Sequence, residues 1–427
     1  MKQLKTALRH LVARQLERRV QRLIETRRLK VVAITGSVGK TSTKLAVATV
    51  LGQKYRVQVQ RGNFNSEIGL PLAIFELDVP AALSNPLAWL RIMSQIDKKL
   101  AGDYPYDVLV LELGVDEPGD MARYLRYLTP DIGIVTAIAA AHLEQLGSLT
   151  AIAREKMALA RASRAVLLNA EDKRVMTEAG SLGKPIQTYG VAAGEVHWEH
   201  VRRAKDLTLA GSLILNDGEI TVQTTAIGKH NLAPLAAAAA VGEELGLTST
   251  EIAAGVEAIT PFAGRMQVLA GADGSTIIDD TYNAAPTAVL AALQTLTELP
   301  GRHIAILGSM NELGAQSEHE HREVGAAAAK KVDLLVTVGT EAGSYIAAGA
   351  AAAGLPAEQI HAFRSPYKAG EYVRSKLGAG DIVLAKGSQN GVFAEEAVAL
   401  LLANPADKAK LVRQNPAWQQ RKRAQFS

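Results

Sequence analysis

Short apolar runs alternate with amphipathic stretches along most of the chain, and this order predicts alternating strands and helices. Each run is bounded by turn residues, which is typical of a buried strand. The predicted strands are residues 31–35, 55–60, 107–113, 131–138, 165–169, 275–279, 303–308, 334–338 and 382–385. Helical stretches fill the gaps between them. The pattern therefore predicts an α/β protein with mostly parallel sheets covered by helices.

The alternation changes at two places, and these changes predict the domain boundaries. Short alternating stretches with Gly and Asp turns over about residues 186–225 indicate a small β appendage. After the stretch PFAGRM at 261–266, strands and helices begin to alternate again. We therefore expect a central domain over residues 29–265 and a smaller Rossmann-like domain over 266–403. The polar, basic residues 404–427 are expected to be frayed or disordered.

The first 28 residues predict a basic amphipathic helix, because leucine, valine and isoleucine recur at helical spacing among many arginines and lysines. One interpretation is a helix that lies on an anionic membrane surface. The other is a helix packed on its own domain, with the basic face in solvent. We favour the second, since the segment contains no aromatic anchor.

Composition narrows the class of protein. The 427 residues are 48% apolar and 21% charged, as expected for a globular protein with more than one domain. Cysteine is absent, which excludes disulfides, thiolate metal sites and cysteine nucleophiles. No apolar run approaches the roughly 20 residues of a spanning helix, so we expect a cytoplasmic protein. The net charge of +4 is small, and no nucleic-acid partner is expected.

The stretch TGSVGKTSTK at residues 35–44 follows the first strand and predicts a phosphate loop. A glycine turn that enters a helix points several backbone N–H groups at one place, where the helix dipole also favours an anion. Lys40 would reach the terminal phosphates, and the Thr41 hydroxyl would bind Mg²⁺. An ordinary glycine turn is the alternative. The residues expected to bind nucleotide are Gly36, Ser37, Gly39, Lys40, Thr41 and Ser42.

Polar residues also follow later strands. Glu112 ends the strand 107–113, where an acidic residue can hold Mg²⁺ directly or through water. His142 comes just after the strand 131–138, and Lys156 lies on the next helix. Taken alone, each of these residues is more often structural. Three polar loops mark the second domain, and they are DDTYNAAP at 279–286, GSMNELG at 308–314 and KGSQNG at 386–391.

Together these stretches resemble the Mur ligase family of ATP-dependent enzymes, which join an acid to an amine. The resemblance rests on TGSVGKTSTK, GNFNSEIGLPL, LELGVDEPGDM, AAHLEQLGS, AREK, GKHN, GRM, DDTYNAAP, LGSMNELG and KGS, in family order over about residues 30–395. It implies a central ATPase domain and a Rossmann-like domain with ATP between them.

The resemblance also implies roles for matching residues. Lys40 and Thr41 would bind the ATP phosphates and Mg²⁺, with Glu112 on the metal. His142 would lie near a second Mg²⁺. Lys156 matches a lysine that is carbamoylated in many members and supplies a carboxylate to that metal, the alternative being an unmodified surface lysine.

Four further residues match family positions around the nucleotide. Asn231 would contact the adenine, and Arg265 would bind the γ-phosphate. Asp280 would bind the ribose, and Asn283 lies in a loop that closes over the base. Closure of the second domain would then assemble the site and exclude water.

The implied reaction forms an acyl phosphate and then an amide, with a UDP-muramoyl tripeptide as the acid and D-Ala-D-Ala as the amine. Two departures leave the substrates open. Family members carry an N-terminal UDP-binding domain that 30 residues cannot replace, and KGSQNG lacks an arginine often found after KGS. The alternatives are a Mur-like ligase for another carboxylate, and a nucleotide-binding subunit that needs a partner.

Overall fold

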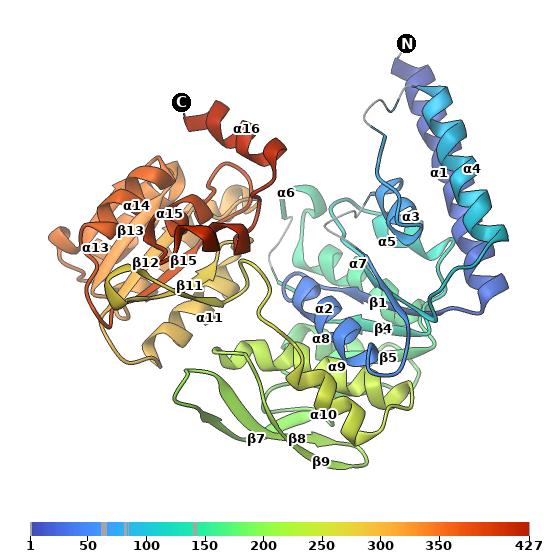
Figure 1. Cartoon of the computed structure of the whole chain (residues 1–427), viewed down its shortest axis with the longest axis horizontal. Coiled ribbons are helices and arrows are strands. Elements are labelled where there is room, and N and C mark those ends of the chain that lie inside the picture. Colours follow the sequence, from blue (N-terminus) through green and yellow to red (C-terminus); the bar gives the residue numbers. More distant parts are fainter. Residues whose placement is uncertain (1, 61–65, 81–82, 84, 140–142, 427) are drawn as a thin grey trace.

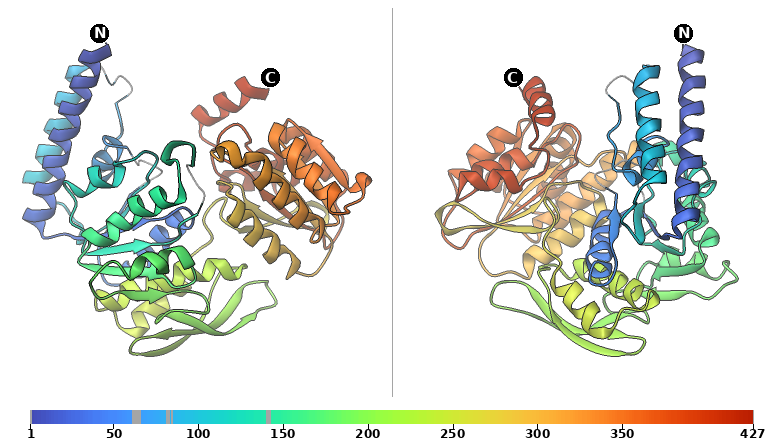
Figure 2. Two further views of the ribbon diagram at one scale, coloured as in Figure 1. Left: turned by 180° about the vertical axis from the view of Figure 1, so that it is seen from behind. Right: turned by 45° about the vertical axis from the view of Figure 1, so that its right-hand side comes forward.

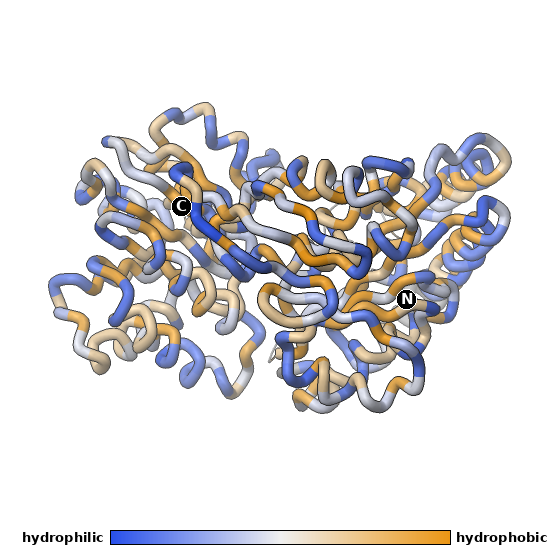
Figure 3. The backbone as a smooth tube through the Cα atoms, turned by 90° about the horizontal axis from the view of Figure 1, so that it is seen from below, coloured by the Kyte–Doolittle hydropathy of each residue, from blue (hydrophilic) through white to orange (hydrophobic). Residues whose placement is uncertain are grey.

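Two six-stranded sheets form the framework of the protein (Figure 1). The computed structural model describes residues 2–60, 66–80, 83, 85–139 and 143–426. The sheets lie in separate α/β units, and the carboxyl ends of their parallel strands face a shared pocket. Hydrophobic segments concentrate in the interior of each unit, with hydrophilic segments toward the outside (Figure 3). The architecture confirms the predicted α/β fold.

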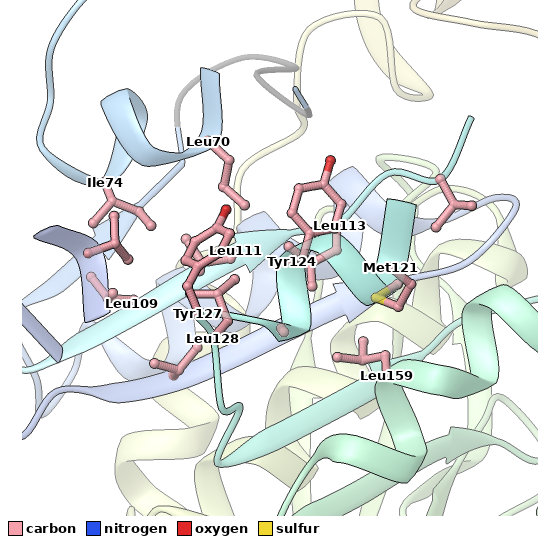
Figure 4. Close-up of a cluster of buried hydrophobic side chains, with 14 of the residues drawn as sticks. Leu70, Ile74, Leu109, Leu111, Leu113, Met121, Tyr124, Tyr127, Leu128 and Leu159 are labelled. Atoms are coloured by element: carbon pink, nitrogen blue, oxygen red, sulfur yellow. The ribbon is translucent and has the colours of Figure 1, made fainter. Parts of the chain in front are cut away.

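The first sheet is entirely parallel, in the order β2-β3-β1-β4-β5-β6. Its strands are β1 (Lys30–Thr35), β2 (Val57–Val59), β3 (Val108–Glu112), β4 (Ile132–Val135), β5 (Ala165–Asn169) and β6 (Gln187–Tyr189). All five residues of β3 are buried, as expected for the apolar run at residues 108–111 that precedes Glu112. Figure 4 shows Leu109, Leu111 and Leu113 packed with residues of α3, α5 and α7 on one face of this sheet.

Helices and one small sheet surround the first sheet. The helices are α1 (Lys2–Arg27), α2 (Lys40–Leu51), α3 (Gly69–Ile74), α4 (Pro86–Ala101), α5 (Asp120–Leu125), α6 (Leu143–Leu146), α7 (Leu149–Ala162), α8 (Lys173–Ala179), η1 (Lys229–Asn231), α9 (Leu232–Glu244) and α10 (Ser249–Glu257). The antiparallel sheet consists of β7 (His197–Arg203), β8 (Leu209–Leu215) and β9 (Gly218–Gln223). This sheet is the predicted β appendage. Residues 187–189 do not belong to it, because β6 pairs with β5 in the parallel sheet.

The second sheet has the order β10-β11-β15-β12-β13-β14, and only β10 is antiparallel. Its strands are β10 (Gln267–Ala270), β11 (Thr276–Asp280), β12 (His303–Gly308), β13 (Leu334–Val338), β14 (Ile360–Phe363) and β15 (Ile382–Lys386). The sequence pattern missed β10 and β14. Both are edge strands with several exposed or half-buried residues, so neither carries a continuous apolar run.

Helices and short helical turns make up the rest of the second unit. They are η2 (Ala272–Gly274), α11 (Pro286–Thr297), η3 (Gly314–Gln316), α12 (Ser317–Ala329), η4 (Ala342–Ile346), α13 (Ala347–Ala352), η5 (Ala357–Gln359), α14 (Pro366–Arg374), α15 (Glu395–Leu401), η6 (Pro405–Lys410) and α16 (Pro416–Phe426).

The basic helix α1 lies along α4, and the pair projects from the first unit (Figure 2). Val12, Leu16, Val20 and Leu23 on α1 are buried in the core of that unit. Arg19 also pairs with Asp97 of α4 at 2.9 Å. This packing is what the second interpretation of residues 1–28 predicts. None of the described helices is long and apolar enough to cross a membrane.

The prediction of a frayed tail over residues 404–427 is wrong. This region contains η6 and α16, and the Lys422 side chain of α16 is fully buried. Lys422 pairs with Glu395 at 2.8 Å and with Glu396 at 2.6 Å, both on α15. The polar composition suggested disorder because sequence alone does not show that the basic residues neutralise buried carboxylates elsewhere in the chain.

Candidate nucleotide-binding site

A pocket with a cavity volume of about 750 Å³ lies between the two α/β units. One wall comes from the loops after β1 and β3 and from η1, and the other from the loops after β11, β12 and β15. The predicted residues that line it are Ser37, Gly39, Lys40, Thr41, Ser42, Glu112, Asn231, Arg265, Asp280 and Asn283. A cavity of this size can hold a nucleotide, and this position is usual for ligands of open α/β sheets.

The phosphate loop requires glycine at two positions. Gly36 has φ of 151°, and a Cβ atom there would lie 1.9 Å from Thr136 Oγ1. Gly39 has φ of 82°, a left-handed conformation, directly before α2 begins at Lys40. The loop therefore connects a buried strand to a helix N-terminus, which is the structural context that a phosphate loop needs.

Lys40 curls over this loop and donates a hydrogen bond from Nζ to Gly36 O at 2.8 Å. Burial lowers the pKa of its ammonium group, and Glu112 partly opposes this shift. Arg265, across the pocket, also lowers the pKa. The ammonium group is therefore in a cationic, poorly solvated place that a bound anion would relieve.

Glu112 lies between a hydroxyl and a second lysine. Thr41 donates a hydrogen bond from Oγ1 to Glu112 Oε2 at 3.0 Å, and Lys44 Nζ is 3.4 Å from the same oxygen. Lys44 and Glu112 are only 2% and 3% exposed. Burial lowers the pKa of Lys44, an effect that Glu112 opposes. Lys44 was not among the residues predicted for the site, although it follows Lys40 by one helical turn in TGSVGKTSTK.

The hydroxyl of Thr41 and the carboxylate of Glu112 fit Mg²⁺, which prefers oxygen ligands. Among the described residues, no three histidine, cysteine, aspartate or glutamate side chains form a metal cluster. A magnesium ion held here would therefore need phosphate oxygens and waters as its other ligands, which is usual for this ion. His142 lies outside the described residues.

Lys156 lies beneath the loop and not on the surface. Its side chain is 1% exposed, and Nζ donates a hydrogen bond to Gly36 O at 3.1 Å. Burial, followed by the charge of Lys40, lowers the pKa of Lys156 to about 7. A large share of this amine is therefore uncharged near neutral pH, so it can act as a nucleophile.

Arg265 enters the pocket from the connection between the two units. Its guanidinium carbon lies 4.1 Å from the centre of the Tyr282 ring. In the described part of the chain, its buried Nε atom has no hydrogen-bond partner. The contact of Tyr282 with Arg265 was not predicted from the sequence. An arginine with an unsatisfied buried N–H, facing a phosphate loop, is well suited to bind an anion.

Asp280 ends β11 and Asn283 lies in the loop after it, and Lys386 contacts both residues. Lys386 Nζ is 2.6 Å from Asp280 Oδ2 and 3.1 Å from Asn283 O. Asp280 also accepts a hydrogen bond from the Met266 backbone at 3.3 Å. Asn231, at the end of η1, faces this loop across the pocket. The fold thus brings together the described residues that the sequence predicted.

The sequence matches the profile of the Mur ligase middle domain over residues 34–83 and 91–242. It also matches the Mur ligase glutamate ligase domain over residues 264–389. The UDP-N-acetylmuramoyl-tripeptide–D-alanyl-D-alanine ligase of Bacillus subtilis (strain 168) is 30% identical over 382 residues, which cover 88% of this chain and 76% of that enzyme. The chain belongs to the Mur ligase family.

A further relative and a solved structure also match the chain. The Mycobacterium leprae enzyme of the same name is 33% identical over 401 residues, covering 85% of this chain and 71% of its own length. The crystal structure of MurF ligase from Thermotoga maritima in complex with ADP aligns with a TM-score of 0.76 and 24% identity, over 93% of this chain and 84% of that one. This structure establishes the shared fold of the Mur ligases.

Proposed function

We propose that this Mur ligase uses ATP to join the carboxylate of a UDP-N-acetylmuramoyl tripeptide to the amino group of D-alanyl-D-alanine. The observation that carries the proposal is the shared pocket, in which a phosphate loop faces an arginine from the other side. The named relatives act on these substrates according to their names, and the Thermotoga maritima relative holds ADP.

In this proposal ATP spans the pocket. The N–H groups of the phosphate loop and the Lys40 ammonium bind its phosphates, and Arg265 binds the γ-phosphate from the opposite side. Asp280 holds the ribose, while Asn231 and Asn283 contact the base. The cations around the loop support this placement, because a triphosphate would neutralise charges that are otherwise close together and partly buried.

The proposed reaction has two steps, formation of an acyl phosphate and then of an amide. The substrate carboxylate attacks the γ-phosphorus, the bond to the β-phosphate oxygen breaks, and an acyl phosphate and ADP result. The uncharged amine then attacks the acyl carbon, phosphate leaves, and the amine loses a proton. Lys40 and Arg265 offset the repulsion between the carboxylate and the triphosphate in the first step. Most of the catalysis is thus positioning and charge stabilisation.

Thr41 and Glu112 would hold Mg²⁺, which supplies Lewis-acid stabilisation of the phosphate charge. Lys156 would carry a carbamate that gives a second metal site its carboxylate, together with His142. The uncharged amine of Lys156 supports this assignment, because only the deprotonated form reacts with CO₂.

The alternative functions differ from this proposal in how the acid substrate is chosen or held. A ligase for a different carboxylate, or a nucleotide-binding subunit that receives its substrate site from a partner, would use the same pocket.

We place the protein in the cytoplasm, and we propose that α1 supports the first unit instead of binding a membrane, since its apolar face is buried there.

Phosphate release with ATP, Mg²⁺ and UDP-muramoyl-tripeptide, with and without D-Ala-D-Ala, tests the proposal. We expect release only when both substrates are present, and none from a Lys40→Met variant. Release in the absence of either substrate would contradict the ligase reaction. No release from a protein that still binds ATP would contradict the substrates, and a screen of other acids and added partner proteins would then separate the alternatives.

A further inference from the structure

Residues 405–426 contact two turns beside the pocket, the turn before Arg265 and the turn at Tyr282. Arg413 donates hydrogen bonds from Nη1 to Tyr282 O at 3.0 Å and from Nη2 to Thr281 O at 2.6 Å. The neighbouring Val412 packs against Gly264, where a Cβ atom would lie 3.0 Å from Val412 Cγ1. The segment therefore reaches the turn before Arg265 and the turn at Tyr282.

The Arg413 side chain is fixed on its other side by Glu395 of α15. Nε donates to Glu395 Oε1 at 2.8 Å and Nη2 to Oε2 at 2.7 Å, so the pair is bidentate. The two side chains are only 7% and 0% exposed. A forked, buried pair of this kind allows little rotation of the guanidinium group.

Further charges hold the backbone at Arg413. Lys422 donates a hydrogen bond from Nζ to Arg413 O at 2.9 Å and pairs with both Glu395 and Glu396. Burial acts to raise the pKa of the Glu396 carboxyl, but the hydrogen bond and charge of Lys422 outweigh it and the pKa is lowered. The Glu396 carboxylate is thus a charged anchor for the segment.

The backbone of Arg413 has a conformation that is unusual for arginine. Its φ angle is 56°, in the left-handed region where a side chain carries a steric cost. Such conformations persist when the surrounding contacts determine them, and they are frequent near functional sites. In this conformation the guanidinium group donates hydrogen bonds to the Thr281 and Tyr282 carbonyls.

Tyr282 connects these contacts to the pocket. Its backbone N–H donates to Gly264 O at 3.0 Å, and its ring lies against the Arg265 guanidinium group. A movement of the Thr281–Tyr282 turn would therefore move the surface on which Arg265 rests. The path from Glu395 through Arg413 and Tyr282 to Arg265 consists of direct contacts.

We propose that Arg413 is a positioning residue that sets the orientation of Arg265 toward the terminal phosphate of ATP. The proposal rests on the nucleotide function proposed for Arg265. It predicts that loss of Arg413 weakens binding of the γ-phosphate while leaving the rest of the nucleotide site intact. It also gives the 405–426 segment a functional role in the pocket that it adjoins.

The test compares affinities for ADP and for a non-hydrolysable ATP analogue, both with Mg²⁺, by calorimetry. We expect Arg413→Met to weaken the analogue about tenfold more than ADP, because a charge-assisted contact to the γ-phosphate is lost. Lys408→Met is the matched control. Lys408 pairs with Glu396 at 3.2 Å from the same segment but has no hydrogen bond to residues 281–282 among the described contacts. Its analogue-to-ADP ratio should equal that of the wild type.

Two more variants separate positioning from simple stabilisation. Arg413→Lys keeps the charge opposite Glu395 but cannot reach both carbonyls in a forked geometry, so we expect it not to restore the ratio. In an Arg265→Met background, Arg413→Met should change the analogue-to-ADP affinity ratio less than twofold. The reason is that both substitutions remove the same interaction, the contact of Arg265 with the γ-phosphate. Trp418 packs on Phe393, so the fluorescence lost when Trp418→Phe is added to each variant reports that the segment stays docked.

An equal loss of ADP and analogue binding, or a tenfold effect that persists without Arg265, would overturn the positioning role alone. A wild-type protein that binds neither nucleotide would overturn the proposed nucleotide site and this proposal with it. The binding measurement needs no acid or amine substrate. A protein that ligates other substrates would therefore still give the expected analogue-to-ADP ratio, and only the substrates proposed above would be wrong.

Discussion

Two buried lysines near the pocket, Lys386 of the second α/β unit and Lys156 of the first, have opposite electrostatic surroundings. Lys386 of the second unit lies 2.6 Å from the Asp280 carboxylate. Lys156 of the first unit has a backbone carbonyl as its hydrogen-bond acceptor and Lys40 as a charged neighbour, and its pKa is lowered to about 7. The comparison teaches that burial gives a lysine a structural or a chemical role according to its partner.

The largest effect should come from breaking the paired lysine. Lys386→Met leaves the Asp280 carboxylate buried without its cation, and we expect it to lower the free energy of unfolding by about 3–5 kcal/mol. Urea denaturation measures this change. A double variant with Asp280→Asn should recover much of the loss, because the unpaired charge is removed. A loss below about 1 kcal/mol for Lys386→Met alone would show that solvent reaches the pair.

The unpaired lysine should respond chiefly in activity. Lys156→Met removes an amine with one hydrogen bond to a carbonyl, so above about pH 10.5, where this amine is uncharged in both the folded and the unfolded chain, we expect a stability change within about 1 kcal/mol. We expect phosphate release under ligase conditions to fall about 100-fold, the size of effect typical for lost support of a metal site. Steady-state kinetics and denaturation of one preparation give both numbers. Full activity of the variant would contradict the role of Lys156.

The pKa of Lys156 also predicts how stability depends on pH. The folded pKa of about 7 lies below the ordinary value of 10.5, so between these values the unfolded chain binds more protons. Stability from this group is complete above 10.5 and is lost as the pH falls toward 7. In CO₂-free buffers, the stability of wild type relative to Lys156→Met should rise by about 1.4 kcal/mol per pH unit above 7. A flat difference would show that Lys156 stays charged.

The smallest effect is expected for an ion pair with good geometry in solvent. Arg56 Nη2 lies 2.9 Å from Asp107 Oδ1, but the two side chains are 65% and 39% exposed. We expect Arg56→Ala to leave the midpoint of urea unfolding unchanged within error, because water screens such pairs. This variant calibrates the Lys386 measurement. A shift as large as that of Lys386→Met would mean that distance, and not burial, decides the strength of these pairs.

The local sequence determined much of the framework and the phosphate loop. Strands such as 165–169 and 303–308 were predicted at their observed bounds, because buried parallel strands need continuous apolar runs. The loop at 36–41 could be recognised because glycine conformations and a helix N-terminus are properties of neighbouring residues. The resemblance to the Mur ligases then supplied candidate residues in both units, and most of those that the structure describes line one pocket.

Tertiary structure alone decided which charges meet. The pairs Lys386–Asp280 and Arg413–Glu395 join residues 106 and 18 positions apart, and Lys156 reaches Gly36 across 120 positions. The sequence shows that these side chains are charged, but their pKa values and strengths depend on burial and on partners brought by the fold. For the same reason, residues 404–427 were predicted to be a disordered polar tail, although Lys408, Arg413 and Lys422 pair with Glu395 or Glu396, which only the folded chain places beside them.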